Sequence, residues 1–242
     1  MVLRSRQATL TERAYEHIRA KLVSGELAPG TRLVNRAIAK EIGASAIPVR
    51  EAISRLISEG MVEYVPSAGA FVRERSPQEL SDMFDLREAL EPMAAAKATE
   101  HISDHEVEEL QSIVDDWREM VRGLRHRPEG HLSASQMDRW QDNERRFAQV
   151  LIDAARNGLL SKMARELLVV GQVFDAQRSE PAALTPAAAE GRARAHDILL
   201  QGLRARDPAK MRELMLAHIK KERETVVSPS RRPGPGRNDR RR

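Results

Sequence analysis

Three arginines in the first 75 residues stand where short helical runs would present them to a polyanion. Arg50 and Arg55 belong to one helical run, and Arg36 lies near the start of the run before it. A guanidinium can donate two hydrogen bonds to guanine O6 and N7, or it can neutralise a phosphate. These residues therefore indicate DNA binding, with ordinary surface arginines on a small scaffold domain as the alternative.

The sequence lacks the motifs of common enzyme and membrane-protein classes. It contains no pattern that places a nucleophile beside a base, no Gly-rich phosphate loop and no cysteine, which excludes disulfides and thiolate metal sites. No stretch approaches 18 consecutive apolar residues, and residues 1–10 have no apolar run of signal-peptide length. We expect a cytoplasmic protein that is not an enzyme and has no contact with a membrane.

Charge divides the chain into three parts. Residues 1–75 hold twelve Lys or Arg against eight Asp or Glu, whereas residues 76–227 carry a net charge of −5. Residues 228–242 hold six Arg and one Asp, with three Pro, two Gly and no large apolar side chain. We expect the first part to meet DNA and the last to be a disordered basic tail, which could also hold DNA nonspecifically.

Residues 1–75 predict three helices followed by a β-hairpin. Apolar residues recur at helical spacing in residues 11–24, 38–42 and 46–60, and Ser45 and Pro48 suit the start of the third helix. Two short apolar segments then flank the turn at residues 66–69. This order predicts a winged helix-turn-helix domain, in which the third helix enters the major groove. The hairpin tip would approach a phosphate or the minor groove with Ser67 and Gly69.

From residue 76 to residue 227 the apolar spacing is helical throughout. It predicts an all-α antiparallel bundle, with Pro92 kinking the first helix and a polar loop at 126–135. The fold class is therefore mostly α. We expect a DNA-binding domain at 1–75, an effector-binding and dimerisation domain at 76–227, and the tail at 228–242.

Five sequence runs of the N-terminal part resemble the GntR family of bacterial regulators. These are Gly25–Leu33, Ile38–Ser45, Pro48–Leu56, Glu59–Val62 and Gly69–Val72, in the order and spacing of the family. The resemblance implies a homodimer whose winged helices bind a palindromic double-stranded operator. The residues that it assigns to DNA binding, together with the pattern above, are Arg36, Ser45, Ile47, Pro48, Arg50, Arg55, Ser67 and Gly69.

The recognition helix departs from the family pattern at two positions. The family usually opens this helix with Ser-Arg-Thr-Pro-Val-Arg-Glu, and here Ala46 replaces the first arginine while Ile47 replaces the threonine. Arg50 matches the second arginine. One base or phosphate contact is therefore missing, and we expect a different operator sequence and a lower affinity.

The C-terminal part resembles the FCD effector domain of the FadR-type branch of GntR regulators. The resemblance rests on Asp85–Pro92, on Phe147 followed by Asn157–Leu160, and on the later histidines. Many members hold a zinc, nickel or manganese ion with an Asp, a His four residues later and two further His, leaving a position for an organic acid. The matching residues here are Glu144, Ala148, His196 and His218.

This ligand set is incomplete, because Ala148 cannot bind a metal. Glu144, His196 and His218 could still hold a divalent ion, although more weakly. Alternatively, the histidines are ordinary residues of a site that has lost its ion. Arg87 is a candidate to pair with a ligand carboxylate, an intramolecular ion pair being the alternative. Arg178, Arg192 and Arg194 could serve similarly.

Together these features predict a dimeric repressor that a small organic acid releases from DNA. Effector binding would change the angle between the two winged domains, so that they no longer fit half-sites about one helical turn apart. One alternative is a metal-dependent helical enzyme using Glu144, His196 and His218, which leaves the DNA-binding half unexplained. Another is a ligand-free architectural DNA protein, for which the acidic second domain is unnecessary.

Overall fold

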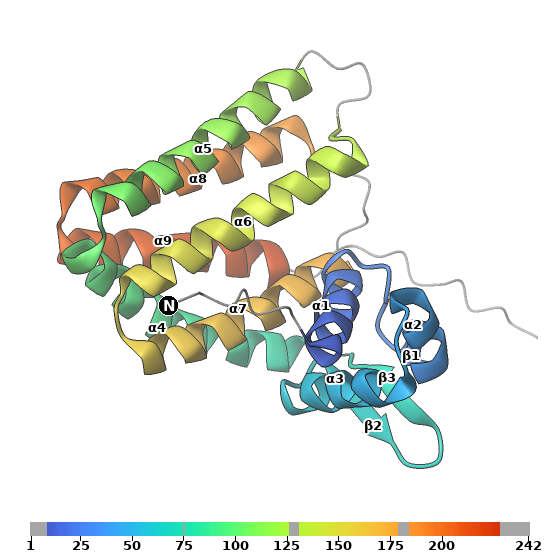
Figure 1. Cartoon of the computed structure of the whole chain (residues 1–242). Coiled ribbons are helices and arrows are strands. Elements are labelled where there is room, and N and C mark those ends of the chain that lie inside the picture. The colour runs from blue at the N-terminus through green and yellow to red at the C-terminus, as the bar shows by residue number, and fades with distance from the viewer. Residues whose placement is uncertain (1–8, 75, 126–130, 179–183, 228–242) are drawn as a thin grey trace, which may run out of the picture.

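The computed structural model describes residues 9–74, 76–125, 131–178 and 184–227. These residues form a small domain of three helices and a sheet, beside a larger helical bundle (Figure 1). The predicted fold class is confirmed, and the predicted helices agree with the observed ones to within a few residues. The expected tail at 228–242 lies outside the described residues. The elements are α1 Leu10–Val23, β1 Arg32–Leu33, α2 Asn35–Ile42, α3 Ala46–Ser58, β2 Val62–Val65, β3 Gly69–Val72, α4 Pro77–His101, α5 Asp104–Arg125, α6 Ala134–Ala154, α7 Gly158–Arg178, α8 Pro186–Ala205 and α9 Pro208–Val227.

The small sheet has one strand more than the sequence predicted. Its order is β1-β3-β2, with both pairs antiparallel, and Arg32 of β1 lies opposite Phe71 of β3. The prediction of only two strands was wrong, because a strand of two residues is too short to show the alternation that identifies a strand. The added strand holds the base of the hairpin to the segment between α1 and α2.

The small domain has its own hydrophobic core. Fully buried side chains of α1 and α3, including Ile18, Leu22 and Leu56, pack together and against the sheet. Gly43 ends α2 in the left-handed conformation, with a φ of 64°, which turns the chain sharply towards α3. Ser45 lies at the N-cap position of α3 as predicted, but its side chain makes no capping hydrogen bond.

The bundle is built around α4, which follows the sheet directly. Ser76 and Glu79 form a capping box that starts α4, and Arg73 Nη2 lies 2.5 Å from Glu79 Oε1, which ties the last strand to the helix. The helix continues through Pro92 and packs against α9, α6, α7 and α8. None of the described helices is both long and apolar enough to cross a membrane.

An aromatic cluster fills the other side of the bundle. Trp117 of α5 is fully buried, and its ring centroid lies 5.8 Å from those of Trp140 and Phe147, both on α6. These contacts lock α5 to α6 and place Phe147 next to α8. The core of the bundle is separate from the core of the small domain, so each unit has its own hydrophobic centre.

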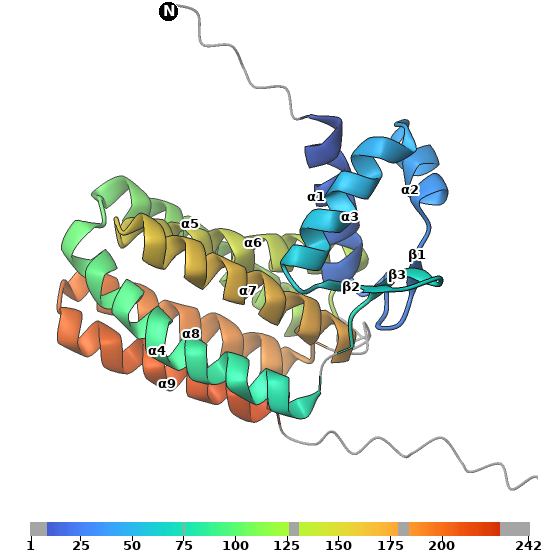
Figure 2. The ribbon, with the colours of Figure 1, turned by 90° about the horizontal axis from the view of Figure 1, so that it is seen from below.

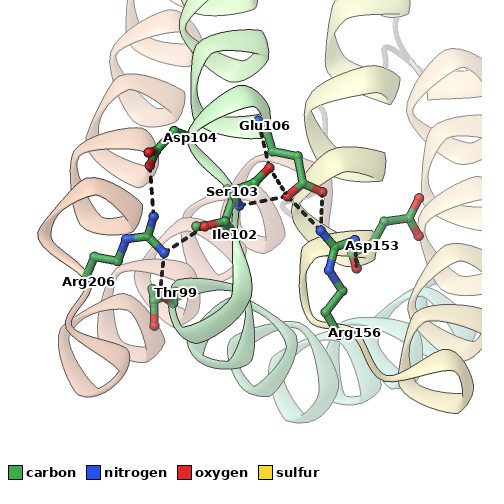
Figure 3. A network of polar contacts seen from close by, with 8 residues as sticks. All are labelled: Thr99, Ile102, Ser103, Asp104, Glu106, Asp153, Arg156 and Arg206. Carbon is green, nitrogen blue, oxygen red and sulfur yellow. Dashed lines mark hydrogen bonds and ion pairs between the residues drawn. The ribbon is translucent and has the colours of Figure 1, made fainter.

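Two arginines fix the turn between α4 and α5 (Figure 3). Arg206 follows α8 in the left-handed conformation, and its Nη1 donates to the carbonyl of Ile102 at 2.7 Å. Arg156, also left-handed, donates to both carboxylate oxygens of Glu106 at 2.8 and 2.9 Å. Glu106 in turn accepts hydrogen bonds from Ser103 at the start of α5. The connections α4–α5, α6–α7 and α8–α9 therefore meet at one end of the bundle.

Gly43 and Gly123 provide a matched pair of substitutions. A Cβ at either position meets no atom within 4 Å, but only Gly43 has a positive φ. We expect Gly43→Ala to lower the free energy of unfolding by about 1–2 kcal/mol through backbone strain. Gly123→Ala, inside α5, should raise it by about 0.5–1 kcal/mol. Urea unfolding of both variants checks the opposite signs, and equal effects would contradict the assigned turn.

Candidate DNA-binding surface and effector cavity

The α3 helix buries one face and exposes the other. Val49, Ile53 and Leu56 pack into the small domain, whereas Arg50 is exposed and Ile47 is 66% exposed. Ile47 is thus an apolar side chain in contact with solvent at the leading turn of the helix, where it could meet a thymine methyl group. Pro48, also predicted to contact DNA, is buried, and its place is in the packing of the helix.

Arg55 has partners inside the small domain. Its guanidinium lies 3.7 Å above the ring of Tyr15, and its Nε donates to Glu59 Oε1 at 3.0 Å. The hydroxyl of Tyr15 donates to the same carboxylate at 2.8 Å, and burial raises the pKa of Tyr15 to about 12. Arg55 therefore connects α3 to α1, and a phosphate contact by this residue stays a prediction.

Three of the remaining predicted DNA contacts, Arg36, Ser45 and Ser67, are exposed, and Gly69 is partly buried. Arg36 lies in the first turn of α2, and Ser45 immediately precedes α3. At the hairpin tip, Ser67 is exposed with a φ of 64° and Gly69 has a φ of 113°. The guanidinium of Arg32 lies against Gly69, so close that a Cβ there would be 3.4 Å from Arg32 Nε. Sequence reasoning missed Arg32 because β1 was not predicted.

The bundle contains a partly open cavity of about 390 Å³ between α4, α6, α7, α8 and α9. The four predicted effector residues all line it, although they are far apart in the sequence: Arg87, Glu144, His196 and His218. Ala148 lines it too, and Arg194 is not among the lining residues. The side chain of Arg178 lies outside the described residues. The apolar part of the wall consists of Ala94, Phe147, Leu151, Ile152, Leu168, Leu199 and Met215.

Arg87 is buried and already has two carboxylate partners. Its Nε lies 2.5 Å from Glu91 Oε1, and its Nη2 lies 2.8 Å from Glu222 Oε2. Burial alone would raise the pKa of Glu222, but the guanidinium of Arg87 lowers it well below its usual range. The predicted alternative of an intramolecular ion pair is therefore present, and the pair joins α4 to α9.

The two cavity histidines lie next to each other, with ring centroids 5.3 Å apart. His196 Nδ1 lies 3.0 Å from the carbonyl oxygen of Arg192, and its ring packs against Trp117 and Phe147. Burial lowers the pKa of His196 to about 4, so its ring is neutral at pH 7, with Nδ1–H as the donor and Nε2 as an acceptor. His218 Nε2 lies 3.3 Å from Glu222 Oε1.

Glu144 accepts two hydrogen bonds on the same oxygen. Trp140 Nε1 donates to Oε1 at 2.9 Å, and Arg192 Nη1 donates to it at 3.4 Å. Burial raises the pKa of Glu144, and the Arg192 guanidinium opposes this shift. Sequence reasoning gave Arg192 no preference over its neighbours and missed Glu222. The i, i+4 spacing of His218 and Glu222 was the available signal.

Comparisons with known proteins agree with this architecture. The model of the bacterial regulatory proteins of the gntR family matches residues 10–72, and the FCD domain model matches residues 82–221. The HTH-type transcriptional regulator McbR of Escherichia coli (strain K12) is 32% identical over 110 residues, which are 46% of this chain and 50% of McbR. This match therefore spans half the length of that relative.

Longer matches are weaker in sequence. The HTH-type transcriptional repressor GlaR of Escherichia coli (strain K12) is 24% identical over 85% of this chain and 90% of its own. The solved structure of E. coli McbR/YncC superposes with a TM-score of 0.76 at 25% identity, covering 91% of this chain and 98% of that one. The chain belongs to the GntR family of bacterial regulators and carries the FCD domain of its FadR-type branch.

Proposed function

We propose that this protein is a transcription repressor that binds operator DNA through α3 and is released by a small molecule in the bundle cavity. The observation that supports this proposal most strongly is the convergence of four charged or imidazole side chains, from four helices, in one cavity of the helical bundle. The names of the relatives, which describe regulators and repressors, favour this function over the enzyme alternative.

The α7 helix offers a route from the cavity to the DNA-binding domain. Leu168 and Gly171 line the cavity, and the same helix packs against α1, which in turn packs against α3 (Figure 1). A Cβ at Gly171 would lie 3.9 Å from Arg87 Nη1, so α7 passes close to the buried ion pair. A ligand that displaces α7 therefore moves α1 and the orientation of α3.

The effector that suits this wall is a small organic acid. The charge of Arg87 is already neutralised by Glu91 and Glu222, so a ligand carboxylate would compete there with two carboxylates of the protein. Arg192 is the available partner, because its side chain is 47% exposed and its contact with Glu144 uses one of its five donors. The apolar wall would hold the rest of the molecule.

Thermal-shift and gel-shift measurements test this function. The full chain is mixed with benzoate, phenylacetate, succinate or citrate, and with the neutral amides benzamide and phenylacetamide as matched controls. We expect one of the acids to raise Tm by several degrees near saturation and to release a duplex from upstream of the protein's own gene. Ala148→Phe, which fills the cavity, should abolish both effects but retain duplex binding. Equal action by the amides would contradict the acid, and release from the filled variant would contradict the cavity.

We further propose that a second copy of this chain covers the outer face of α4 and α7. These helices lie side by side on the face turned towards the viewer in Figure 2. Leu86 and Met93, seven residues apart on α4, are 52% and 41% exposed, and Leu159 and Met163, four apart on α7, are 71% and 45% exposed. Two winged domains on a palindrome require such a symmetric contact.

The order of residues on α4 fits a twofold axis. If two α4 helices cross antiparallel near Ala89, Leu86 of one protomer meets Met93 of the other. The same register places Asp82 next to Lys97 of the other protomer, and both lie on this face of the helix. Apolar contacts at the centre and opposite charges at the rim are the composition expected of a dimer interface.

Light scattering after size exclusion tests this interface. The 27.2 kDa chain should elute at twice its mass, whereas Leu86→Glu should be monomeric or dissociate at least tenfold more readily. Ile198→Glu on α8, where the side chain is 42% exposed, is the matched control and should remain dimeric. Asp82→Lys should weaken the dimer, and adding Lys97→Asp should restore it. A Leu86→Glu protein as dimeric as the control would exclude this face.

A further inference from the structure

The FCD resemblance implies a divalent metal ion held by a carboxylate and three imidazoles, and the cavity only partly fits it. His196 Nδ1 contacts the carbonyl of Arg192, and His218 Nε2 contacts the carboxylate of Glu222. Within the described part of the chain, the opposite ring nitrogens, Nε2 of His196 and Nδ1 of His218, have no hydrogen-bond partner. Such outer contacts are typical of metal-binding histidines. This half of the site is compatible with an ion.

The other half of the site, at Ala148 and Glu144, is not compatible with a metal ion. The methyl group of Ala148 lines the cavity where the third imidazole is expected. The carboxylate of Glu144 is paired with the guanidinium of Arg192, whose Nη1 lies 3.4 Å from Oε1. Among the described residues, no group of three His, Asp or Glu side chains is placed to hold an ion. Two imidazoles alone fall short of the three protein ligands of a typical zinc site.

The positive charge of Arg192 also disfavours a metal ion at this site. A divalent ion at Glu144 would stand beside the guanidinium of Arg192, in a cavity where repulsion between like charges is screened less than in water. Arg192 already neutralises the carboxylate that the ion would neutralise. Its remaining N–H groups can donate hydrogen bonds to an anion. Arg192 can therefore bind a carboxylate, as a metal ion with an open coordination position binds the carboxylate of an organic acid.

We infer that Arg192 replaces the family's metal ion, so that the effector cavity of this protein binds its anionic ligand on a guanidinium without a metal. The inference rests on the proposed effector site. It assigns complementary roles to Ala148 and Arg192: the absent imidazole weakens the metal site, and the arginine supplies positive charge in its place.

Metal titration of a graded series of variants tests this inference. Protein dialysed against EDTA and then into buffer is titrated by calorimetry with ZnCl₂, NiCl₂ or MnCl₂ alone, and circular dichroism verifies that each variant is folded. The wild-type chain should show no saturable binding at the cavity. Arg192→Gln, which frees Glu144, should bind Zn²⁺ or Ni²⁺ weakly, and the Ala148→His, Arg192→Gln double variant should bind at least about tenfold more tightly. Adding His196→Ala should remove the gain.

Stoichiometric binding of any of these ions to the wild-type chain, lost in His196→Ala, would overturn the inference. So would a folded double variant that gains no affinity. The readout does not involve DNA or effector, so a failure of the proposed repressor function would leave the metal result standing. Conversely, a metal-binding wild type could still be a ligand-released repressor.

Discussion

The packing of α3 is the constraint on which the functional account depends. A helix that buries Val49, Ile53 and Leu56 against α1 and the sheet must turn its other face outwards, and that face carries Ile47 and Arg50. The sheet, α1 and the Arg55–Tyr15 contact all hold α3 on its buried side. The N-terminal turn of α3 is therefore a rigid part of the surface. Rigid presentation of a few side chains is what recognition in the major groove requires.

A second constraint joins this surface to the bundle. The α4 helix starts directly after the sheet and carries Arg87, whose buried pairs with Glu91 and Glu222 hold α4 to α9 beside the cavity. The α7 helix passes the same cavity and packs against α1. The DNA-binding domain therefore contacts the bundle through α4 and α7, which both line the cavity. A ligand that shifts either helix can change the position of α3.

Sequence alone predicted the fold and most of the site, for identifiable reasons. Long amphipathic helices can be identified by the helical spacing of their apolar residues, and α4–α9 were therefore placed correctly. The two residues of β1 are too few to show any such spacing. The FCD resemblance assigned Glu144, His196 and His218 to one site, with Arg87 as a further candidate, and all four line one cavity. The sequence did not reveal that Glu222 pairs with Arg87, or that Arg192 pairs with Glu144, because these contacts depend on how separate helices pack. Glu91 lies four residues after Arg87 on α4, so the sequence did offer a signal for that pair.

The most direct test of the central claim is the effect of Arg50→Ala on DNA affinity. Fluorescence anisotropy with a duplex from upstream of the protein's own gene, at fixed salt concentration, compares it with the wild type. Arg212→Ala, which removes an exposed arginine from α9, is the control for lost charge. We expect Arg50→Ala to lose about 1–3 kcal/mol of specific binding free energy while remaining dimeric, and the control to bind as the wild type does. Unchanged affinity of Arg50→Ala would contradict the placement of α3 in the groove.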